Sequence, residues 1–342
     1  MANTLFQYPG GKSGQYDRIK AIMPDHVCFV EAFGGSGAVT LNKPPSEVNV
    51  YNDLDSDITH FFTVYREAPE RLIEWVEKVP YSFEHFEEFT RIYYKGEFND
   101  PPINTKIAEP DEITDSHIRR AGVFFSLRYM QWGAKYSGKA GFGRSKVQNG
   151  ASTFTNAKKR LDEMIGCWDH VTVENLSYDE LEGPYDSEDT LWYFDPPYVG
   201  TEKYYVESGF EHEPFVDWLM DLEGYWIISY DELPECLQEQ VDKHDHLHTS
   251  VEESTNFIDS GLKGEGKDTI ESIVTNYDPS EVTKFIASNQ TGISDSKWGG
   301  ETVNNPKTVS NSEETEDDSD NNENDEFLSE YDVDVEEGFL DV

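Results

Sequence analysis

Short apolar runs that predict β-strands alternate along the chain with segments of helical spacing. HVCFVEAF at 26–33 ends in the glycine turn GGSG at 34–37, after which AVTLN at 38–42 predicts the start of a helix. EVNVYND at 47–53 predicts a second strand, and DITHFFTVYREA at 57–68 has the apolar spacing of a helix. The first part of the chain therefore predicts two strand–helix units in succession.

The alternation is interrupted in the middle of the chain and then returns. From about Pro69 to Arg160 the pattern is irregular and rich in aromatic residues, with one helical stretch in HIRRAGVFFSLRYMQW. Further strand-length apolar runs follow in HVTVENLSY, TLWYFDPPY, GYWIISYDE and TIESIVTNYD. Apolar strands that alternate with helices predict an α/β fold with a doubly wound, mostly parallel sheet, into which the middle segment is inserted.

Length and composition exclude several classes of protein. The 342 residues can bury a sizeable core, and we expect a cytoplasmic protein without a membrane partner because neither a membrane span nor a signal peptide is indicated. Cys28, Cys167 and Cys236 are isolated, so neither a disulfide framework nor a structural zinc site is indicated. KHDHLH places three histidines at alternate positions, but a solvated loop is the simpler interpretation, and no metal site is predicted.

The charge balance is strongly acidic, with 69 acidic and 27 basic residues and a net charge of −42. Fifteen of the acidic residues lie in 309–342, where no basic residue follows Lys307, and we expect this tail to be disordered. The chain before the tail still has twice as many acidic as basic residues. Because molar salt limits the range of charge interactions to ~3 Å, such a surface suits a halophilic organism.

Residues 116–161 reverse this balance. They include no Asp or Glu but ten of the 27 basic residues, mixed with aromatic residues and glycines in YMQWGAKYSGKAGFGRSK. This mixture is expected of a loop or hairpin that follows a phosphate backbone and stacks or wedges against bases. The alternative is that the segment pairs with the protein's own acidic surface. The candidate DNA-binding residues are Arg119, Arg128, Lys135, Lys139, Arg144 and Lys146.

The segment YPGGKSGQY at 8–16 has some features of a phosphate-binding P-loop. A P-loop needs a glycine five positions before its second glycine, and Phe6 occupies that position relative to Gly11. The loop is therefore too short to hold a triphosphate, and Lys12 and its glycine-rich backbone must serve another purpose.

Two observations point to a cofactor that contains adenosine. The glycine turn at 34–37 lies between a strand and a predicted helix, where backbone N–H groups can approach a ligand. Asp53 ends the next strand, 18 residues after Gly35, where its carboxylate can accept hydrogen bonds from both ribose hydroxyls. Thr40 and Ala38 break the dinucleotide and nucleophile-elbow patterns. An ordinary strand–helix turn beside an unrelated Asp remains the alternative.

LWYFDPPY at 191–198 places polar and aromatic groups directly after an apolar strand. Pro196 and Pro197 lead the backbone away from the carboxyl end of the sheet, which is the usual place for a ligand site. Asp195 and the Pro196 carbonyl can each accept one N–H of a planar amino-substituted ring, and Tyr198 can stack on that ring. A nucleobase meets these requirements, and a turn without function is the alternative.

The chain resembles the DNA adenine methyltransferases of the Dam type (class alpha) over about residues 5–280. The resemblance rests on five segments that occur in the same order, YPGGKSG, VEAFGGSG, NDLDSD, FDPPY and SIVTNYD. The resemblance implies a site-specific enzyme that transfers a methyl group from S-adenosylmethionine to the N6 amino group of an adenine flipped out of double-stranded DNA. It implies a Rossmann-like methyltransferase fold with a cofactor-binding half at 1–60, an inserted target-recognition subdomain at 61–165, a catalytic half at 166–287 and the acidic tail at 288–342.

The resemblance also implies roles for individual residues. Ser177 stands where many relatives have an Asp that binds the cofactor adenine, and the N-terminal loop would lie against cofactor and target base. The implied catalytic residues are Asp195, Pro196, Pro197 and Tyr198. The implied cofactor-binding residues are Tyr8, Gly11, Lys12, Glu31, Phe33, Gly35, Gly37, Asp53, Ser177 and Asp195.

The middle segment departs from the resemblance, because it does not include the Asn-Gly-Leu-rich hairpin of the enterobacterial enzymes, and a GATC recognition sequence is not predicted. Amino-methylation of RNA or of cytosine N4 is one alternative, and a catalytically inactive DNA-binding module is another. Cytosine enzymes more often have Ser where Asp195 stands, which favours adenine, and the intact Lys12, Asp53 and DPPY favour an active enzyme. We expect a monomer or a weak dimer.

Overall fold

The computed structural model describes residues 4–8, 11–103, 113–132, 140–200, 209–256 and 267–283, which belong to a compact unit spanning Met1–Gly300. The described helices are α1 (Tyr16–Ile22), α2 (Ser56–Glu67), α3 (Pro69–Glu77), α4 (Phe83–Lys95), α5 (Asp115–Met130), α6 (Gly150–Glu163), α7 (Glu182–Tyr185), α8 (His212–Met220) and α9 (Glu235–Lys243), with short 3₁₀ segments η1 (Lys12–Gly14) and η3 (Tyr178–Leu181). The strands are β1 (Cys28–Glu31), β2 (Val48–Asn52), β3 (Thr172–Glu174), β4 (Thr190–Phe194), β5 (Tyr225–Tyr230), β6 (His248–Asn256) and β7 (Lys267–Thr275).

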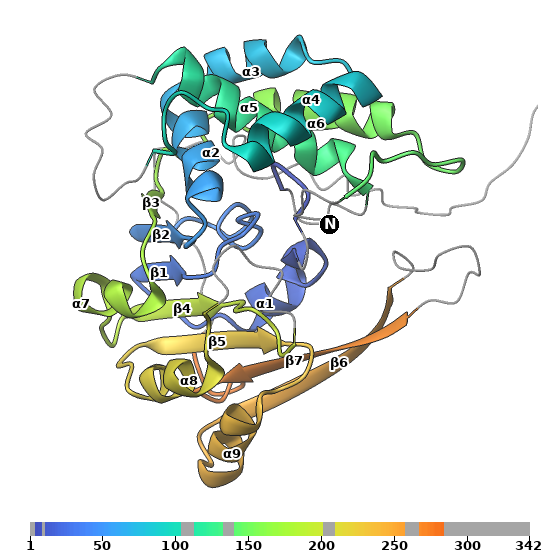
Figure 1. Cartoon of the computed structure of the whole chain (residues 1–342). Helices are drawn as coiled ribbons and strands as arrows, with labels where there is room; N and C mark the ends of the chain where they lie inside the picture. Colours follow the sequence, from blue (N-terminus) through green and yellow to red (C-terminus); the bar gives the residue numbers. More distant parts are fainter. Residues whose placement is uncertain are drawn as a thin grey trace, which may run out of the picture. The chain divides into compact units, whose positions relative to one another are not determined.

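The described strands form one sheet in the order β3-β2-β1-β4-β5-β7-β6 (Figure 1). From β3 to β5 neighbouring strands are parallel, and Val30 of β1 is level with Val50 of β2 and Trp192 of β4. β7 lies between β5 and β6 and is antiparallel to both. Because the parallel strands point the same way, the segments that follow β1, β2, β4 and β5 emerge at one edge of the sheet.

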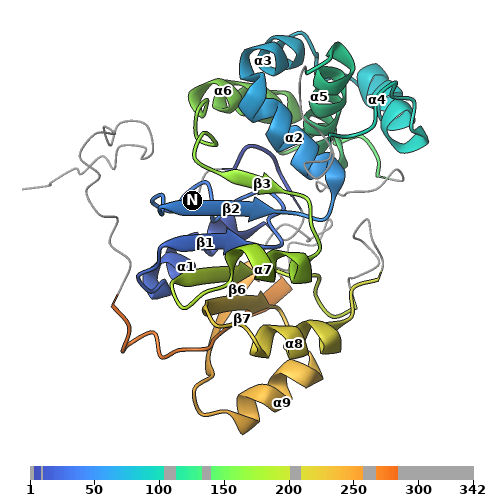
Figure 2. The same cartoon turned by 90° about the vertical axis from the view of Figure 1, so that its left-hand side faces the viewer.

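Apolar side chains cover both faces of this sheet. Val30 and Trp192 belong to a core cluster that includes Phe215 of α8 and residues of α9, whereas Phe29 and Leu191, on alternate positions of the same strands, pack with α1. Helices α8 and α9 lie on one side of the sheet and α1 on the other (Figure 2). Burial on both faces explains why the strands read as continuous apolar runs.

Helices α2 to α6 gather in a layer beyond the β3 side of the sheet (Figures 1 and 2). α5 lies in its interior and is buried on all sides from Ala121 to Met130. Gly122 permits close packing, because a Cβ atom there would lie 2.1 Å from the ring of Trp75. α2 begins at Ser56, before the boundary expected at residue 61, and the limits of a separate subdomain stay a prediction.

The predicted fold class, a mostly parallel α/β sheet with helices on both faces, is confirmed. The helix expected at 38–42 is wrong, because residues 35–42 form a series of turns in which Gly35 and Gly37 have φ of +49° and +65°. β6 was not predicted, because HTSVEESTN is polar and lacks an apolar run. This strand pairs with β7 on one side, at the end of the strand order.

Candidate functional site

Four segments meet at the carboxyl edge of the parallel strands. The glycine turn follows β1, Asp53 follows β2 and Asp195 follows β4. The N-terminal segment joins them, since Lys12 of η1 contacts Asp195 and a Cβ atom on Gly11 would lie 3.4 Å from Ser36 of the turn. Residues that are far apart in sequence are thus brought to one place, as the strand pattern predicts.

The Lys12 ammonium is the centre of a buried polar cluster. Its Nζ atom lies 2.7 Å from Oδ1 of Asp195 and 3.4 Å from Oε1 of Glu271, and it donates a hydrogen bond of 2.6 Å to the Tyr198 hydroxyl. That hydroxyl in turn donates to Glu271 at 3.3 Å. Lys12 is 5% exposed, so it forms a buried ion pair with Asp195, and the Glu271 carboxylate is close enough to interact with the same ammonium.

The charges in this cluster shift one another's pKa. Burial by itself lowers the pKa of Lys12, but Asp195 and Glu271 outweigh burial and hold it above its ordinary value. Burial raises the pKa of Asp195, Lys12 opposes this effect, and Glu271 adds to it. Burial and the same two carboxylates raise the pKa of Tyr198, so its hydroxyl keeps its proton. The two carboxylates therefore favour the charged form of Lys12, and Lys12 in turn favours the ionised form of Asp195.

Asp195 is also supported from the interior of the sheet. Ser229 of β5 donates to Asp195 Oδ1 at 3.4 Å, and its hydroxyl lies 3.1 Å from that of Tyr193. Ser229 and Tyr193 are buried, as are Pro196 and Pro197, whereas Asp195 and Tyr198 are half-buried. The prolines thus belong to the buried base of the site, and the two polar side chains remain partly exposed.

Asp53 binds the glycine turn directly. Its Oδ2 atom accepts the Gly35 N–H at 2.8 Å, and Oδ1 accepts the Asp55 N–H at 2.9 Å. Burial, with the nearby Asp55 adding to it, raises the pKa of Asp53 to about 7. Each oxygen has a second lone pair, so this half-buried carboxylate can still accept hydrogen bonds from a ligand.

Glu31 is buried and binds the protein's own backbone, unlike a residue that contacts a ligand directly. Its Oε2 atom accepts the Thr40 N–H at 2.8 Å and the Thr40 hydroxyl, and Oε1 accepts the Val39 N–H at 3.4 Å. The side chain is 2% exposed, and burial raises its pKa to about 7. Glu31 therefore closes the turn that follows β1, and its main contacts are with the backbone.

The other expected cofactor residues line the same edge. A Cβ atom on Gly35 would lie 3.0 Å from the ring of Tyr8, so the two are in close contact. The Gly11 N–H donates to the Tyr8 carbonyl at 3.1 Å. Phe33 packs edge-on to Phe210 with ring centroids 5.6 Å apart. Tyr8, Gly11, Phe33 and Gly35 are thus brought together around the turn.

The segment after β3 lies beside the end of β2. Asn175 Nδ2 donates to the carbonyls of Asp53 and Leu54, which ties this segment to the end of β2. Ser177 is the N-cap residue of η3, where its side chain and that of Glu180 cap each other's backbone N–H groups. Leu54 is 43% exposed beside Asp53 and offers an apolar surface. Ser177 lies next to the site but its side chain serves the local turn.

The expected DNA-binding residues separate into several groups. Arg144 and Lys146 are exposed, Arg119 is half-buried, and Lys135 and Lys139 lie outside the described residues, as does the acidic tail. Arg128 does not have the exposed position expected of a DNA contact. It is 0% exposed, its guanidinium lies 5.1 Å from the ring of Phe124, and Nη2 donates to Gln131 at 3.1 Å. Here Arg128 packs within the helical layer and is not on the surface.

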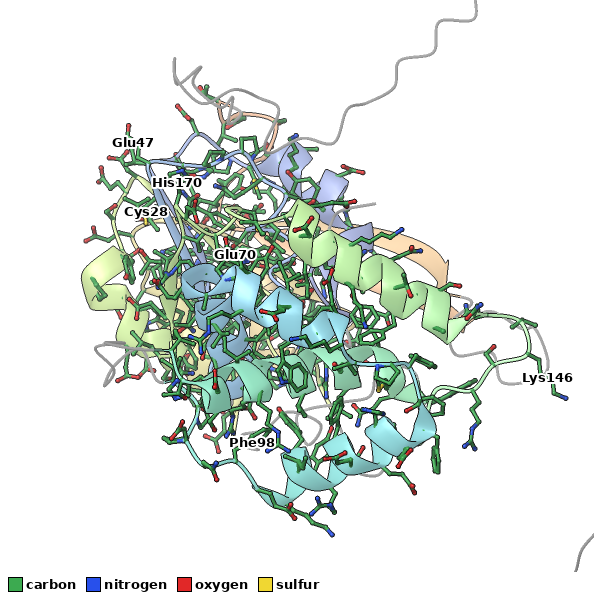
Figure 3. All side chains as sticks on the ribbon, turned by 90° about the horizontal axis from the view of Figure 1, so that it is seen from above. Cys28, Glu47, Glu70, Phe98, Lys146 and His170 are labelled. Atoms are coloured by element: carbon green, nitrogen blue, oxygen red, sulfur yellow. The ribbon has the colours of Figure 1, made fainter. Side chains whose placement is uncertain are left out.

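The exposed basic residues belong to a loop that projects before α6. Figure 3 shows Lys146 at its outer end. The loop is anchored by a bridge between Gln131 and Phe142 and by the Arg144 guanidinium, which lies 4.5 Å from the ring of Phe83. Trp132, at the other side of the bridge, is 55% exposed. Cations and an aromatic ring are therefore presented together on this part of the surface.

Sequence reasoning missed some residues of the site. Glu271 and Ser229 contact the Lys12–Asp195 pair, and Leu54 borders Asp53. Glu271 directly precedes the quoted motif SIVTNYD, which was the available signal. Neither Glu271 nor Ser229 belongs to a sequence pattern with a known chemical role. Their positions become evident only from the pairing of β5 with β7.

Within the described ranges, no group of three or more His, Cys, Asp or Glu side chains is arranged to hold a metal ion. His244 caps the end of α9, and His248 begins β6. The helices of the described part include none long and apolar enough to cross a membrane.

Known proteins share the pattern of this chain. The family model described as D12 class N6 adenine-specific DNA methyltransferase matches residues 8–218, which include Lys12, Asp53 and Asp195. The chain is 24% identical over 290 residues to the type II methyltransferase M1.LlaDCHI of Lactococcus lactis subsp. cremoris, covering 79% of this chain and 94% of that protein. A 66-residue segment, 19% of this chain, is 36% identical to 9% of the DNA N-6-adenine-methyltransferase of Escherichia phage P1.

Proposed function

Because the chain belongs to the D12 class N6 adenine-specific DNA methyltransferase family, we propose that Asp195 to Tyr198 hold the target adenine and that the neighbouring glycine turn binds S-adenosylmethionine. The chain is an adenine-specific DNA methyltransferase. The observation that carries the proposal is the meeting of Asp195, Lys12 and Tyr198 at the sheet edge, beside a glycine turn bound to Asp53.

The residues around the glycine turn fit an adenosine-containing methyl donor. Asp53 is half-buried and keeps lone pairs for two ribose hydroxyls, and Gly35 and Gly37 adopt the positive φ that the tight turn requires. A Cβ atom on Gly37 would lie 3.1 Å from the ring of Trp168, so this glycine also makes room for the core. The exposed Leu54 offers an apolar surface for the adenine ring. Glu31 acts indirectly by holding the turn in shape. When bound, S-adenosylmethionine supplies an electrophilic methyl group on its sulfonium sulfur.

The adenine pocket activates the amino nitrogen through hydrogen bonds. Asp195 and the Pro196 carbonyl accept its two N–H groups, which directs the nitrogen lone pair away from the ring. These contacts would stabilise the positive charge that develops on the nitrogen as its bond to the methyl carbon forms and the bond from that carbon to the donor's sulfur breaks. Asp195 then takes the surplus proton. Tyr198 stacks on the base and offsets part of the few kcal/mol that extrusion from the duplex costs. Much of the remaining rate enhancement comes from holding both reactants together.

Recognition of duplex DNA falls to the helical layer and its projecting loop. Arg144 and Lys146 suit phosphate contacts, and the exposed ring of Trp132 can stack or wedge against bases. The inserted segment 61–165 is therefore the target-recognition part that we propose. We propose a monomer or a weak dimer as the acting form.

The experiment measures transfer of labelled methyl from S-adenosylmethionine to unmethylated DNA in molar KCl, with methylated bases identified by mass spectrometry. Wild type should produce N6-methyladenine, and Asp195→Ala should keep cofactor binding but lose transfer by a factor on the order of 10²–10³. Asp217→Ala, which removes an exposed carboxylate of α8, is the matched control and should remain active.

The alternatives give different results in the same experiment. N4-methylcytosine, or transfer to RNA in place of DNA, would change the substrate while keeping the site. DNA binding without transfer to any base would identify an inactive binding module. Loss of cofactor affinity in Asp195→Ala with unchanged DNA affinity would place Asp195 in the cofactor site and contradict the pocket assignment.

A further inference from the structure

Glu271 faces the adenine pocket from a strand that lies beyond the family match, which ends at residue 218. Its Oε1 atom lies 3.4 Å from Lys12 Nζ and accepts the Tyr198 hydroxyl at 3.3 Å. Its side chain is 17% exposed, close to the 18% of Asp195. Glu271 therefore shares the interior environment of the pocket, although β7 is antiparallel to the strand β5 beside it.

Two carboxylates share one ammonium in this arrangement. Lys12 is closer to Asp195, at 2.7 Å, and it donates to the carboxylate that the proposed function assigns to the adenine amino group. The incoming base must therefore share or displace this interaction. A buried ammonium that loses its carboxylate partner is strongly destabilised, unless another carboxylate is already in place. Glu271 is in place and needs no backbone movement to receive Lys12.

Glu271 also fixes the ring that stacks on the base. The Tyr198 hydroxyl accepts a hydrogen bond from Lys12 and donates one to Glu271, and it also interacts with Asp195. When the base takes Asp195, the contacts with Lys12 and Glu271 remain to hold the hydroxyl. A ring held in this way keeps one plane, and stacking needs no further ordering of the side chain when the base enters. The Glu271 carboxylate thus contacts both Lys12, which must release Asp195 when the base enters, and the hydroxyl of Tyr198, whose ring must stay in position.

Resting on the proposed function, we propose that Glu271 is a positioning residue of the adenine pocket, which holds Lys12 and the Tyr198 hydroxyl when the target adenine takes Asp195 as its acceptor. Glu271 acts through these two side chains and not on the base. Its backbone has a separate structural contact, because Arg18 donates to the Glu271 carbonyl at 3.2 Å and to that of Ser250 at 2.6 Å. Side-chain substitution leaves this backbone contact intact.

The substitution Glu271→Gln separates charge from shape, because the amide keeps an acceptor for the Tyr198 hydroxyl but loses the attraction for Lys12. Lys12 then pairs with Asp195 alone, and the base must compete with an unshared ion pair. The single-turnover rate of N6 methylation should fall by about tenfold to a hundredfold, the range typical of residues that orient a reacting group. Affinities for S-adenosylmethionine and duplex DNA should stay within about twofold of wild type, which is below 0.5 kcal/mol.

Glu271→Asp and Glu281→Gln serve as the comparison variants. Glu271→Asp keeps the charge with a shorter side chain and should recover the rate to within about threefold of wild type, under 0.7 kcal/mol. Glu281 is exposed in the turn after β7, so Glu281→Gln removes a carboxylate without touching the pocket and should have the wild-type rate. The rates are measured with full-length proteins on unmethylated genomic DNA. Thermal unfolding midpoints of all variants show whether a substitution has changed the stability of the fold.

The outcomes distinguish this role from the proposed function itself. If wild type makes N6-methyladenine and Glu271→Gln is equally fast, the positioning role is wrong while the function stands. The role is also wrong if Glu271→Asp is as slow as Glu271→Gln, because charge is then not the cause. If wild type transfers no methyl group to DNA, the proposed function fails and the role that rests on it fails with it.

Discussion

At the scale of single residues, three carboxylates at the sheet edge have different tasks because their surroundings differ. Glu31 accepts hydrogen bonds from the backbone N–H groups of residues 39 and 40, and Asp53 accepts one from the glycine turn. Asp195 forms an ion pair with the Lys12 ammonium. From the sequence, Asp53 was assigned to the ribose and Asp195 to the target base, and the resemblance added Glu31 as a cofactor residue. None of these assignments indicated that Glu31 and Asp53 also bind the backbone of the turn. These contacts depend on burial and on the atoms that each oxygen meets, which a strand pattern does not specify.

The Asp53 carboxylate makes cofactor binding dependent on pH. Only its ionised form can accept both ribose hydroxyls, and burial, with Asp55, raises its pKa to about 7. Affinity for S-adenosylmethionine should therefore be constant above this pH and fall about tenfold per pH unit below it. Titration calorimetry between pH 6 and pH 8.5 measures this dependence, and Asp53→Asn should bind more weakly with a flatter profile, which controls for ionisation of the cofactor.

Conformational stability should respond with the opposite sign. A carboxyl group whose pKa is higher in the folded chain than its usual 3.8 contributes stability at low pH, and this contribution is lost as the pH rises through about 7. Cofactor affinity thus rises over the pH range in which the Asp53 contribution to stability declines. A wild-type affinity that varied with pH no differently from that of Asp53→Asn would show that Asp53 does not accept the ribose.

At the scale of elements, the sequence predicted best the strands buried on both faces. β1, β2, β4 and β5 are apolar runs because helices cover both sides of the sheet. β6 escaped prediction because an edge strand with polar side chains has no such run. The expected helix after the glycine turn does not form, since Gly35 and Gly37 adopt positive φ and Glu31 binds the backbone that a helix would use.

Gly34 begins this turn at a place with no room for a side chain. A Cβ atom there would lie 2.1 Å from the ring of Tyr51, whose hydroxyl donates to the Gly35 carbonyl at 2.6 Å. Gly34→Ala must displace this buried ring, so we expect it to lower stability by roughly 1–3 kcal/mol and to weaken cofactor binding. Chemical unfolding and calorimetry measure the two effects.

Gly183→Ala is the matched control for this substitution. A Cβ atom at Gly183, in α7, meets no atom within 4 Å, and alanine is favoured in a helix by up to about 1 kcal/mol. It should therefore leave cofactor affinity unchanged and stability equal or higher. Wild-type stability in Gly34→Ala would mean that the Tyr51 ring moves without cost and that the tight turn is not needed.

At the scale of the whole molecule, the site is assembled from segments that no local pattern connects. Asp53 and Asp195 became candidates because each belongs to a motif whose chemistry can be inferred from residue types, whereas Lys12 became one only through the resemblance. Glu271 could not be predicted, because its place depends on the insertion of β7 between β5 and β6. Arg128 was misplaced for a related reason, since a basic segment in sequence also includes the buried side of a helix.

The acidic composition is a property of the whole chain, and we expect it to make the fold dependent on salt. With a net charge of −42, carboxylates repel one another over ~10 Å at 0.1 M salt and over ~3 Å at 1 M. Raising KCl over this range should therefore increase the thermal unfolding midpoint, measured by circular dichroism. Sucrose at equal osmolality, which does not screen charge, should raise the midpoint less. A midpoint that is insensitive to KCl, or no more sensitive to KCl than to sucrose, would show that repulsion among the carboxylates does not limit stability and would remove the argument for a halophilic origin.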